Sequence, residues 1–273
     1  MTLPHDHHPP PDTVAATDTD TDTVETAAIA ELDTTVEADA ASAGVEAALV
    51  AAKNLVREQL RARRRGRTAA ARSTAADGIA RHALAIPELA ALLVDTRDRM
   101  SATLNASATA EASGRAGSPS VAAYASYGTE PGTAALRATL SEASVGVLLP
   151  VVRDGGDLGW AWDRDDLGAG VVSPGIPEPT GEIVGRGASG LVAMGVRVLF
   201  APALGVDLAG HRIGKAGGYY DRLLADLDTA APADRPLVVA VVHDDDVVEI
   251  LPVQAHDRAV DAILTPTRYL DLR

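Results

Sequence analysis

A basic, glycine-rich segment at residues 210–221, GHRIGKAGGYYD, has the residue types of a phosphate-binding loop. Glycines let a backbone approach a ligand closely and adopt positive φ, and the helix expected from residue 219 would offer free N–H groups to an anion. The residues concerned are Arg212, Gly214, Lys215, Gly217 and Gly218. Because the segment matches neither G-x-x-x-x-G-K-[ST] nor G-x-G-x-x-G, an ordinary turn is the alternative to a phosphate site.

Two carboxylates have positions suited to a metal ion beside such a phosphate. Asp221 lies in the first turn of the expected helix, where an acid also interacts favourably with the helix dipole. Asp257 lies in QAHDRAVD, residues 254–261, where aspartate is also typical as a turn or capping residue. Mg²⁺ prefers one or two carboxylates together with phosphate oxygens. Structural and metal-binding roles therefore both stay open for these two residues.

Other catalytic chemistries find little support in the sequence. The chain has no cysteine, which excludes thiolate nucleophiles and thiolate metal sites. The segment GRGASGL has Leu191 where the G-x-S-x-G nucleophile motif requires its second glycine, and there is no H-E-x-x-H zinc motif. The segment HDHHPPP near the N-terminus is interpreted as solvated rather than as a metal site.

A helix is expected at residues 45–65, with a basic face. Its apolar stripe consists of Leu49, Ala52, Val56 and Leu60, and its basic residues at four-residue spacing are Lys53, Arg57, Arg61 and Arg65. Like charges at this spacing repel one another by a few tenths of a kcal/mol per pair, and a bound anion would relieve that repulsion. A solvated basic face and a nucleic-acid patch at RARRRGR are the alternatives.

The elements that must position these residues follow a strand and helix alternation. A second helix is expected at about 73–100 and a flexible loop at 105–120. Apolar runs then predict strands at 121–126, 145–152, 158–162, 196–202, 237–242 and 261–266, with helices at about 132–143, 185–194 and 219–229. This alternation predicts an α/β fold with a mostly parallel sheet and helices on both faces. The glycine-rich segment follows the strand at 196–202, where ligands bind in such sheets.

Charge and composition divide the chain. Residues 1–52 hold eleven acids and no Lys or Arg, which leaves only −3 of the net −14 for the rest. We predict a disordered acidic tail at 1–44, rich in Thr, Asp and Ala, and one α/β domain at 45–273. The absence of a signal-like or membrane-spanning apolar run leads us to expect a soluble, cytoplasmic protein.

Several motifs in order make the sequence resemble the 5-formyltetrahydrofolate cyclo-ligase (5,10-methenyltetrahydrofolate synthetase) family. The resemblance covers about residues 47–270. It is carried by Lys53 and Arg57 as K-x-x-x-R, by YASYGTEPGT with Glu130 and Thr133, by GIPEP at 175–179, by RIGKAGGYYD at 212–221 and by LPVQAHDRAVD at 251–261. The loop RIGKAGGYYD is the most specific of these motifs.

The resemblance implies a three-layer α/β/α domain and an ATP- and Mg²⁺-dependent ligase. Such an enzyme converts 5-formyltetrahydrofolate to 5,10-methenyltetrahydrofolate and releases ADP and phosphate. It implies ATP binding by Lys53, Arg57, Arg212, Ile213, Gly214, Lys215, Ala216, Gly217, Gly218, Tyr219 and Tyr220. It implies catalytic roles for Arg212, Lys215 and Tyr219, folate contacts from Ala125, Glu130, Lys215 and Tyr219, and Mg²⁺ binding by Asp221 and Asp257.

Two loop residues depart from the family pattern. Lys215 stands where Tyr or Arg is usual and keeps a charge without a planar guanidinium. Ala216 replaces a glycine, which costs about 1 kcal/mol or more if that position requires positive φ. A non-catalytic folate- or nucleotide-binding relative is therefore the alternative function. We expect a monomer acting on ATP and a small folate, with neither nucleic acid nor membrane as a partner.

Overall fold

The computed structural model describes the backbone of residues 21–105 and 120–273, and the side chains of residues 42–101 and 120–273. The chain divides into two compact units, residues 1–48 and residues 49–273. All contacts discussed below lie within the second unit. None of the described helices is both long and apolar enough to cross a membrane.

The first helix, α1, spans Thr21–Arg65, so the start that we predicted at residue 45 is wrong. The backbone of residues 21–44, which we assigned to a disordered tail, is helical. The physical reason is composition: this stretch is rich in alanine, which has the highest helix propensity, and it contains no proline and a single glycine at its end. Residues 1–20 and 106–119 lie outside the described residues, and the domain boundary at residue 44 stays a prediction.

The helix predicted at 73–100 is in fact two helices. The first, α2, spans Ala69–Ala83, and Thr68 caps it by accepting a hydrogen bond from the backbone N–H of Ala71 at 3.2 Å. The second, α3, spans Pro87–Asn105. Proline is favoured at a first helical position and disfavours helical backbone in the residue before it. Pro87 therefore begins a new helix where the apolar periodicity suggested a continuous one.

The central sheet has eight strands in the order β13-β12-β10-β7-β1-β2-β3-β6. Neighbours from β12 to β2 pair in parallel, while β13, β3 and β6 add antiparallel edges. The strands are β1 Ser120–Ala122, β2 Gly146–Val152, β3 Leu158–Trp162, β6 Ile183–Arg186, β7 Val196–Pro202, β10 Leu237–Val241, β12 Ala262–Leu264 and β13 Tyr269–Asp271. The prediction of a mostly parallel sheet is confirmed.

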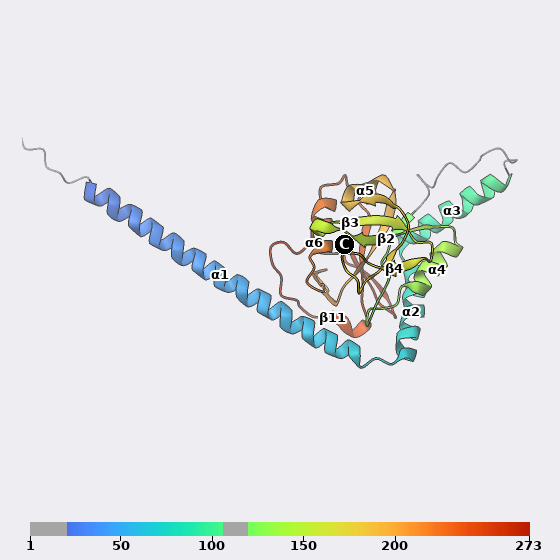
Figure 1. Cartoon of the computed structure of the whole chain (residues 1–273), viewed down its shortest axis with the longest axis horizontal. Helices are drawn as coiled ribbons and strands as arrows, with labels where there is room; N and C mark the ends of the chain where they lie inside the picture. Colours follow the sequence, from blue (N-terminus) through green and yellow to red (C-terminus); the bar gives the residue numbers. More distant parts are fainter. Residues whose placement is uncertain (1–20, 106–119) are drawn as a thin grey trace, which may run out of the picture. The chain divides into compact units, whose positions relative to one another are not determined.

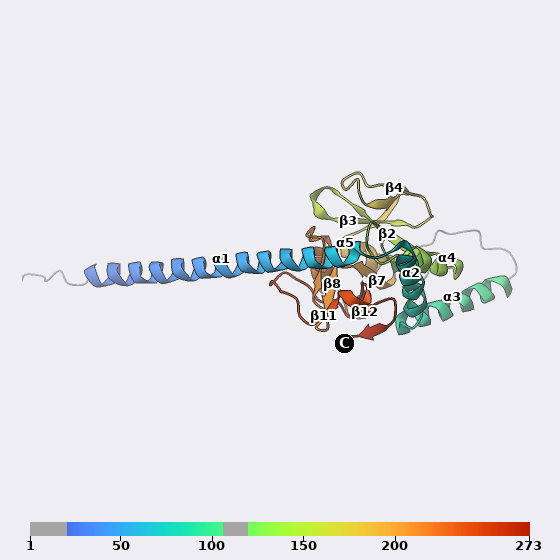
Figure 2. The ribbon, with the colours of Figure 1, turned by 90° about the horizontal axis from the view of Figure 1, so that it is seen from below.

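Helices cover both faces of this sheet, which confirms the three-layer α/β/α architecture (Figures 1 and 2). On one face α2, α3 and α4, Ala134–Glu142, pack against alternate strand residues such as Val121 and Phe200. On the other face α5, Gly187–Ala193, and α6, Tyr219–Leu227, pack against the intervening residues, among them Leu199. Strand residues buried on both faces explain the continuous apolar runs in the sequence.

Short strands that the sequence did not predict frame the glycine-rich segment. A three-stranded sheet has the order β11-β8-β9, with β11 Val247–Val248, β8 Gly205–Asp207 and β9 Arg212–Ile213. A two-stranded sheet pairs β4, Leu167–Ala169, with β5, Pro177–Pro179. Single turns of 3₁₀ helix lie at Asp154–Gly156 and Asp244–Asp246. Leu60 of α1 packs against Ile213 of β9, so α1 and the small sheet share a core.

Candidate functional site

A cavity of about 360 Å³ lies beyond the carboxyl ends of β1 and β7, where ligands bind in parallel sheets. Every site residue predicted from the sequence lines it. These residues are Lys53, Arg57, Ala125, Glu130, Arg212, Ile213, Gly214, Lys215, Ala216, Gly217, Gly218, Tyr219, Tyr220, Asp221 and Asp257. The structure thus brings together segments from both ends of the domain, while the roles of the individual residues stay predictions.

The glycine-rich loop joins β9 to α6 and adopts unusual backbone angles. Gly218 has φ +65° as the residue that caps α6, and Ala216 has φ +84°. The position where this chain departs from glycine therefore does use the left-handed region, in which a Cβ is costly. A Cβ at Gly217 would stand 2.6 Å from the ring of Tyr219, so that position requires glycine.

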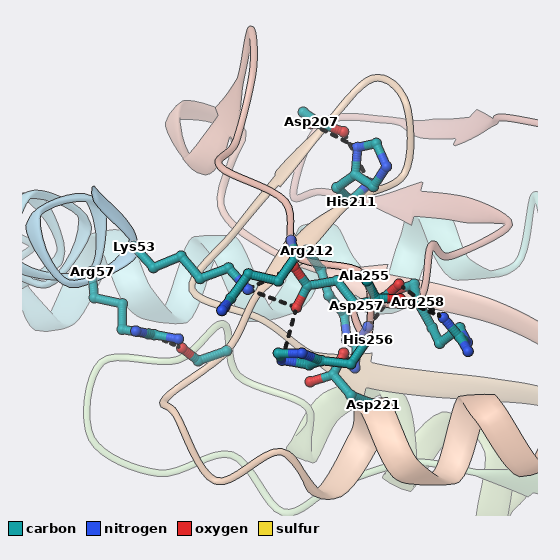
Figure 3. Close-up of polar contacts among 12 residues, drawn as sticks. Lys53, Arg57, Asp207, His211, Arg212, Asp221, Ala255, His256, Asp257 and Arg258 are labelled. Carbon is teal, nitrogen blue, oxygen red and sulfur yellow. Dashed lines mark hydrogen bonds and ion pairs between the residues drawn. The ribbon is translucent and has the colours of Figure 1, made fainter. Parts of the chain in front are cut away.

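Side chains from other elements hold this loop. The Arg57 guanidinium of α1 donates through Nε to the carbonyl of Gly214 at 3.0 Å (Figure 3). Arg222 of α6 donates to the carbonyls of Gly217 at 3.3 Å and Gly156 at 2.8 Å. Its guanidinium also lies 5.3 Å from the centroid of the Tyr219 ring. The loop is therefore fixed at both ends although its centre is conformationally strained.

On one side of the cavity α1 supplies positive charge. Figure 3 shows Lys53 pointing from α1 to Asp257, with its Nζ at 2.7 and 2.6 Å from the two carboxylate oxygens. Burial would raise the pKa of Asp257, but hydrogen bonds from the Gln254 N–H and the Lys53 ammonium outweigh burial and lower it. Burial and the neighbouring Arg61 lower the pKa of Arg57. The repulsion expected along this face is thus present, and an anion would relieve it.

The second acid, Asp221, pairs with Arg212. Arg212 donates to Oδ1 of Asp221 at 2.9 Å and to the carbonyl of Arg258 at 2.6 Å. Within the described part of the chain Oδ2 of Asp221 accepts no hydrogen bond, whereas both oxygens of Asp257 contact Lys53. Asp221 therefore fits Mg²⁺ as it stands, and Asp257 fits it once Lys53 turns to another anion.

The described residues contain no group of three or more His, Asp or Glu side chains placed for a metal ion. Mg²⁺ takes few protein ligands and uses phosphate oxygens and water for the rest. One or two carboxylates, such as those of Asp221 and Asp257, are therefore enough for an ion that binds together with a phosphate.

On the other side of the cavity Glu130 is a buried carboxylate, with 5% of its side chain exposed. Its Oε2 accepts a hydrogen bond from the backbone N–H of Tyr127 at 2.9 Å. Its Oε1 lies 2.7 Å from the ammonium of Lys215, which in turn lies 3.5 Å from the centroid of the Tyr127 ring. Thr133, the second residue of the Glu-x-x-Thr motif, donates a hydrogen bond to the carbonyl of Tyr124 at 2.5 Å and so fixes the turn.

Sequence reasoning missed two tyrosines of the cavity, Tyr124 and Tyr127. The signal was present, because both flank the segment that carries Glu130. Burial, reinforced by the charge of Glu130, raises the pKa of Tyr124 and of the predicted Tyr220. The buried Tyr220 hydroxyl has no hydrogen-bond partner among the described residues, and its raised pKa keeps it protonated. Gln254 and His256 were also missed.

Part of the arginine-rich segment at 61–67 is paired within the fold, although only Arg64 is buried. Arg64 is fully buried, pairs with Asp246 at 2.8 Å and donates to the carbonyls of Ala203 and Leu204. Arg63 and Arg67 both contact Asp245. Three of the five arginines in RARRRGR are therefore engaged within the fold, which argues against a free basic patch of the kind that binds nucleic acid.

Comparisons with known proteins agree with this geometry. Residues 50–266 match the model of the 5-formyltetrahydrofolate cyclo-ligase family. The 5-formyltetrahydrofolate cyclo-ligase of Mycolicibacterium smegmatis (strain ATCC 700084 / mc(2)155) is 38% identical over 157 residues, which cover 54% of this chain and 74% of that relative. The residues matched by the family model include all of those that line the cavity described above.

Two solved structures show the same fold. The NMR structure of Aquifex aeolicus 5,10-methenyltetrahydrofolate synthetase superposes with a TM-score of 0.57 and 24% identity, over 81% of this chain and 93% of that one. A 5,10-methenyltetrahydrofolate synthetase from Mycoplasma pneumoniae gives a TM-score of 0.51 and 13% identity, over 78% and 98% respectively. At these identities the likeness speaks for the fold alone.

Proposed function

Because the chain belongs to the 5-formyltetrahydrofolate cyclo-ligase family, we propose that its cavity binds 5-formyltetrahydrofolate with ATP and Mg²⁺ and forms 5,10-methenyltetrahydrofolate, ADP and phosphate. One observation carries the proposal. A single cavity joins a cluster of cations suited to phosphates with a buried carboxylate suited to the N–H donors of a pterin. The reaction needs both ligands in contact with each other.

The phosphate side consists of α1, the glycine-rich loop and the start of α6. Lys53, Arg57 and Arg212 supply positive charge, and the loop supplies backbone N–H groups at a helix N-terminus. Phosphoryl transfer asks a protein chiefly to position the reactants and neutralise charge. A site built from cations and backbone, without a protein nucleophile, meets that demand.

The folate side is built around Glu130. A buried carboxylate accepts strong, charge-assisted hydrogen bonds from paired N–H donors, which matches the amino and ring N–H groups of a pterin. Ala125 and Tyr219 form walls beside it, and the protonated Tyr220 hydroxyl is available to an acceptor on the ligand. Arg212, Lys215 and Tyr219 line the same cavity. We assign Arg212 and Tyr219 to the reacting formyl group, and Lys215 to the transferred phosphate once its ammonium has left Glu130.

The metal ion belongs to the phosphate side. Asp221 would hold Mg²⁺ through Oδ2, and Asp257 would join it when Lys53 turns to phosphate. When bound, the ion neutralises charge on the phosphate oxygens. The protein's own contribution is to orient these carboxylates, which Arg212 does for Asp221 through its 2.9 Å hydrogen bond.

All predicted site residues of one chain line one cavity, so the site needs no residue from a second copy. We propose that the protein acts as a monomer on small molecules and not on nucleic acid. Light scattering of the purified protein should give a mass near the 28.0 kDa of one chain. A dimer mass at low micromolar concentration would contradict this proposal.

The test of function is a spectrophotometric assay of methenyl product with 5-formyltetrahydrofolate and MgATP. We expect product only when ATP and Mg²⁺ are both present, and loss of at least about 100-fold in kcat/KM for Glu130→Gln and for Asp221→Asn, the range found on removing one stabilising group. Arg99→Met, which removes a charge on α3 outside the cavity, is the control. Full activity of Asp221→Asn would overturn the metal assignment.

The alternative of a binding-only relative gives a different result in the same experiment. It predicts that calorimetry detects binding of 5-formyltetrahydrofolate while ATP is not consumed. The alternative was suggested by Ala216, which replaces a glycine of the family pattern. Its φ of +84° shows that the loop holds alanine in the left-handed conformation.

A further inference from the structure

The ion pair between Lys215 and Glu130 connects the two sides of the cavity. The backbone of Lys215 directly follows Gly214, whose carbonyl is held by Arg57 on the phosphate side. Its ammonium nevertheless reaches across to Glu130 on the folate side, at 2.7 Å, and lies over the ring of Tyr127. One flexible side chain therefore spans from the loop to the carboxylate assigned to the pterin.

This contact uses the same acceptor that the folate would need. The two oxygens of Glu130 are occupied by the Tyr127 N–H at 2.9 Å and by the Lys215 ammonium. A planar ring with paired N–H donors requires an open carboxylate edge, and the Lys215 ammonium covers the Oε1 side of it. The cation–π contact with Tyr127 adds to the stability of that arrangement.

The Lys215 ammonium can also dissociate from the Glu130 carboxylate. Its side chain is 38% exposed, compared with 5% for that of Glu130, so the ammonium gains solvent when it leaves. The cost falls on the buried Glu130 carboxylate, and an incoming ligand must therefore supply N–H donors in place of the ammonium. The neighbouring Ala216, at φ +84°, keeps the loop in a strained conformation, which favours rearrangement once the ion pair is broken.

We propose, on the basis of the function inferred above, that Lys215 is a specificity-determining residue that occupies Glu130 in the folate-free protein and must be displaced by the incoming ring. A ligand that offers N–H donors to Glu130 replaces the ammonium and is bound. A ligand without those donors leaves the ion pair intact and is rejected. The displaced ammonium is then released toward the phosphate side, to which its backbone is anchored.

The ion pair itself is tested without any ligand, because Lys53 and Lys215 are the two lysines of the chain. An endoprotease that cleaves only after lysine acts on Lys215 when the loop opens, while Lys53 lies inside α1 and is buried. Glu130→Gln should increase the rate of cleavage after Lys215 about fivefold, the equivalent of a pair worth about 1 kcal/mol. Glu142→Gln, on the exposed side of α4, should leave the rate unchanged. Equal rates for Glu130→Gln and the unmodified protein would overturn the proposal.

The competition is tested by equilibrium binding of 5-formyltetrahydrofolate without ATP. If the ion pair is formed in about four fifths of the molecules, its removal lowers the apparent Kd about fivefold. Lys215→Met, which keeps the length and removes the charge, should therefore bind the folate about fivefold more tightly, and Arg99→Met should not. Weaker or unchanged binding by Lys215→Met would show that Lys215 is a contact for the folate or a bystander, and would overturn the proposal.

The two measurements separate this inference from the proposed function. A protein that makes no methenyl product but shows the faster cleavage of Glu130→Gln retains the ion pair while the proposed function fails. A protein that makes the product but shows neither faster cleavage nor tighter binding retains the function while this inference fails.

Discussion

The strain at Ala216 gives the most direct test of the loop geometry. Ala216 has φ +84°, and a Cβ in the left-handed region costs roughly 1–2 kcal/mol. Glycine removes that cost but gains entropy in the unfolded chain, worth about 0.4–1 kcal/mol. The net expectation for Ala216→Gly is a free energy of unfolding that is higher by about 0.5–1 kcal/mol. For a domain of this size that corresponds to a rise in Tm of roughly 1–4 °C.

The assay is chemical denaturation followed by tryptophan fluorescence, since Trp160 and Trp162 are buried in the core. Ala230→Gly is the matched control, because Ala230 follows α6 and its φ is not positive. The control should lose about 0.4–1 kcal/mol from the same entropy effect. The two substitutions are thus expected to change stability in opposite directions. Equal destabilisation by both would refute the left-handed conformation of Ala216.

Three further perturbations test the surrounding charges. Lys53→Met leaves the Asp257 carboxylate without its ammonium and removes the phosphate contact that we propose for Lys53, so kcat/KM for ATP should fall by about 100-fold or more in steady-state assays; an unchanged value would contradict the ATP assignment. Arg64→Met leaves the fully buried Asp246 unpaired, and denaturation should show a loss of about 3–5 kcal/mol, whereas a loss below 1 kcal/mol would refute the argument. Burial, with the nearby arginines, lowers the pKa of His243 to about 4. Between pH 6.5 and 4 the unfolded state therefore binds this proton while the folded state does not. As the pH is lowered through this window, the free energy of unfolding should decrease by up to about 3 kcal/mol. His243→Asn should lose that part of the pH dependence, and an identical pH profile would count against it.

The sequence predicted best where local pattern and tertiary structure agree. Strand β7 was placed at 196–202, as observed, because a strand buried on both faces is a continuous apolar run. Helix α6 was placed at 219–229 and ends at Leu227. The break between α2 and α3 was missed, since the apolar periodicity continues through Leu84 and Ile86. Only the backbone restriction before Pro87 decides that boundary.

Motif order selected residues that line one cavity, but it did not predict the contacts between them. Motif order identified Glu130, Lys215 and Asp257, yet no spacing rule indicates that Lys215 pairs with Glu130. The same limit explains the arginine-rich segment, where a basic face was expected. The partner of Arg64 is Asp246, 182 residues away. The spacing of residues within a helix or strand cannot indicate a pairing at that separation.

The pairing of Lys53 with Asp257 also has a consequence for the order of events during synthesis. The two residues are 204 positions apart, so at a translation rate of about 5–20 residues per second the ammonium is made roughly 10–40 s before its carboxylate. Through that interval the strands from β1 to β10 are synthesised, while Lys53 of α1 still lacks its C-terminal partner. The cavity is therefore among the last parts of the nascent chain to be completed, and a chain that ends before residue 257 lacks both β12 and β13 of the sheet and the carboxylate that pairs with Lys53.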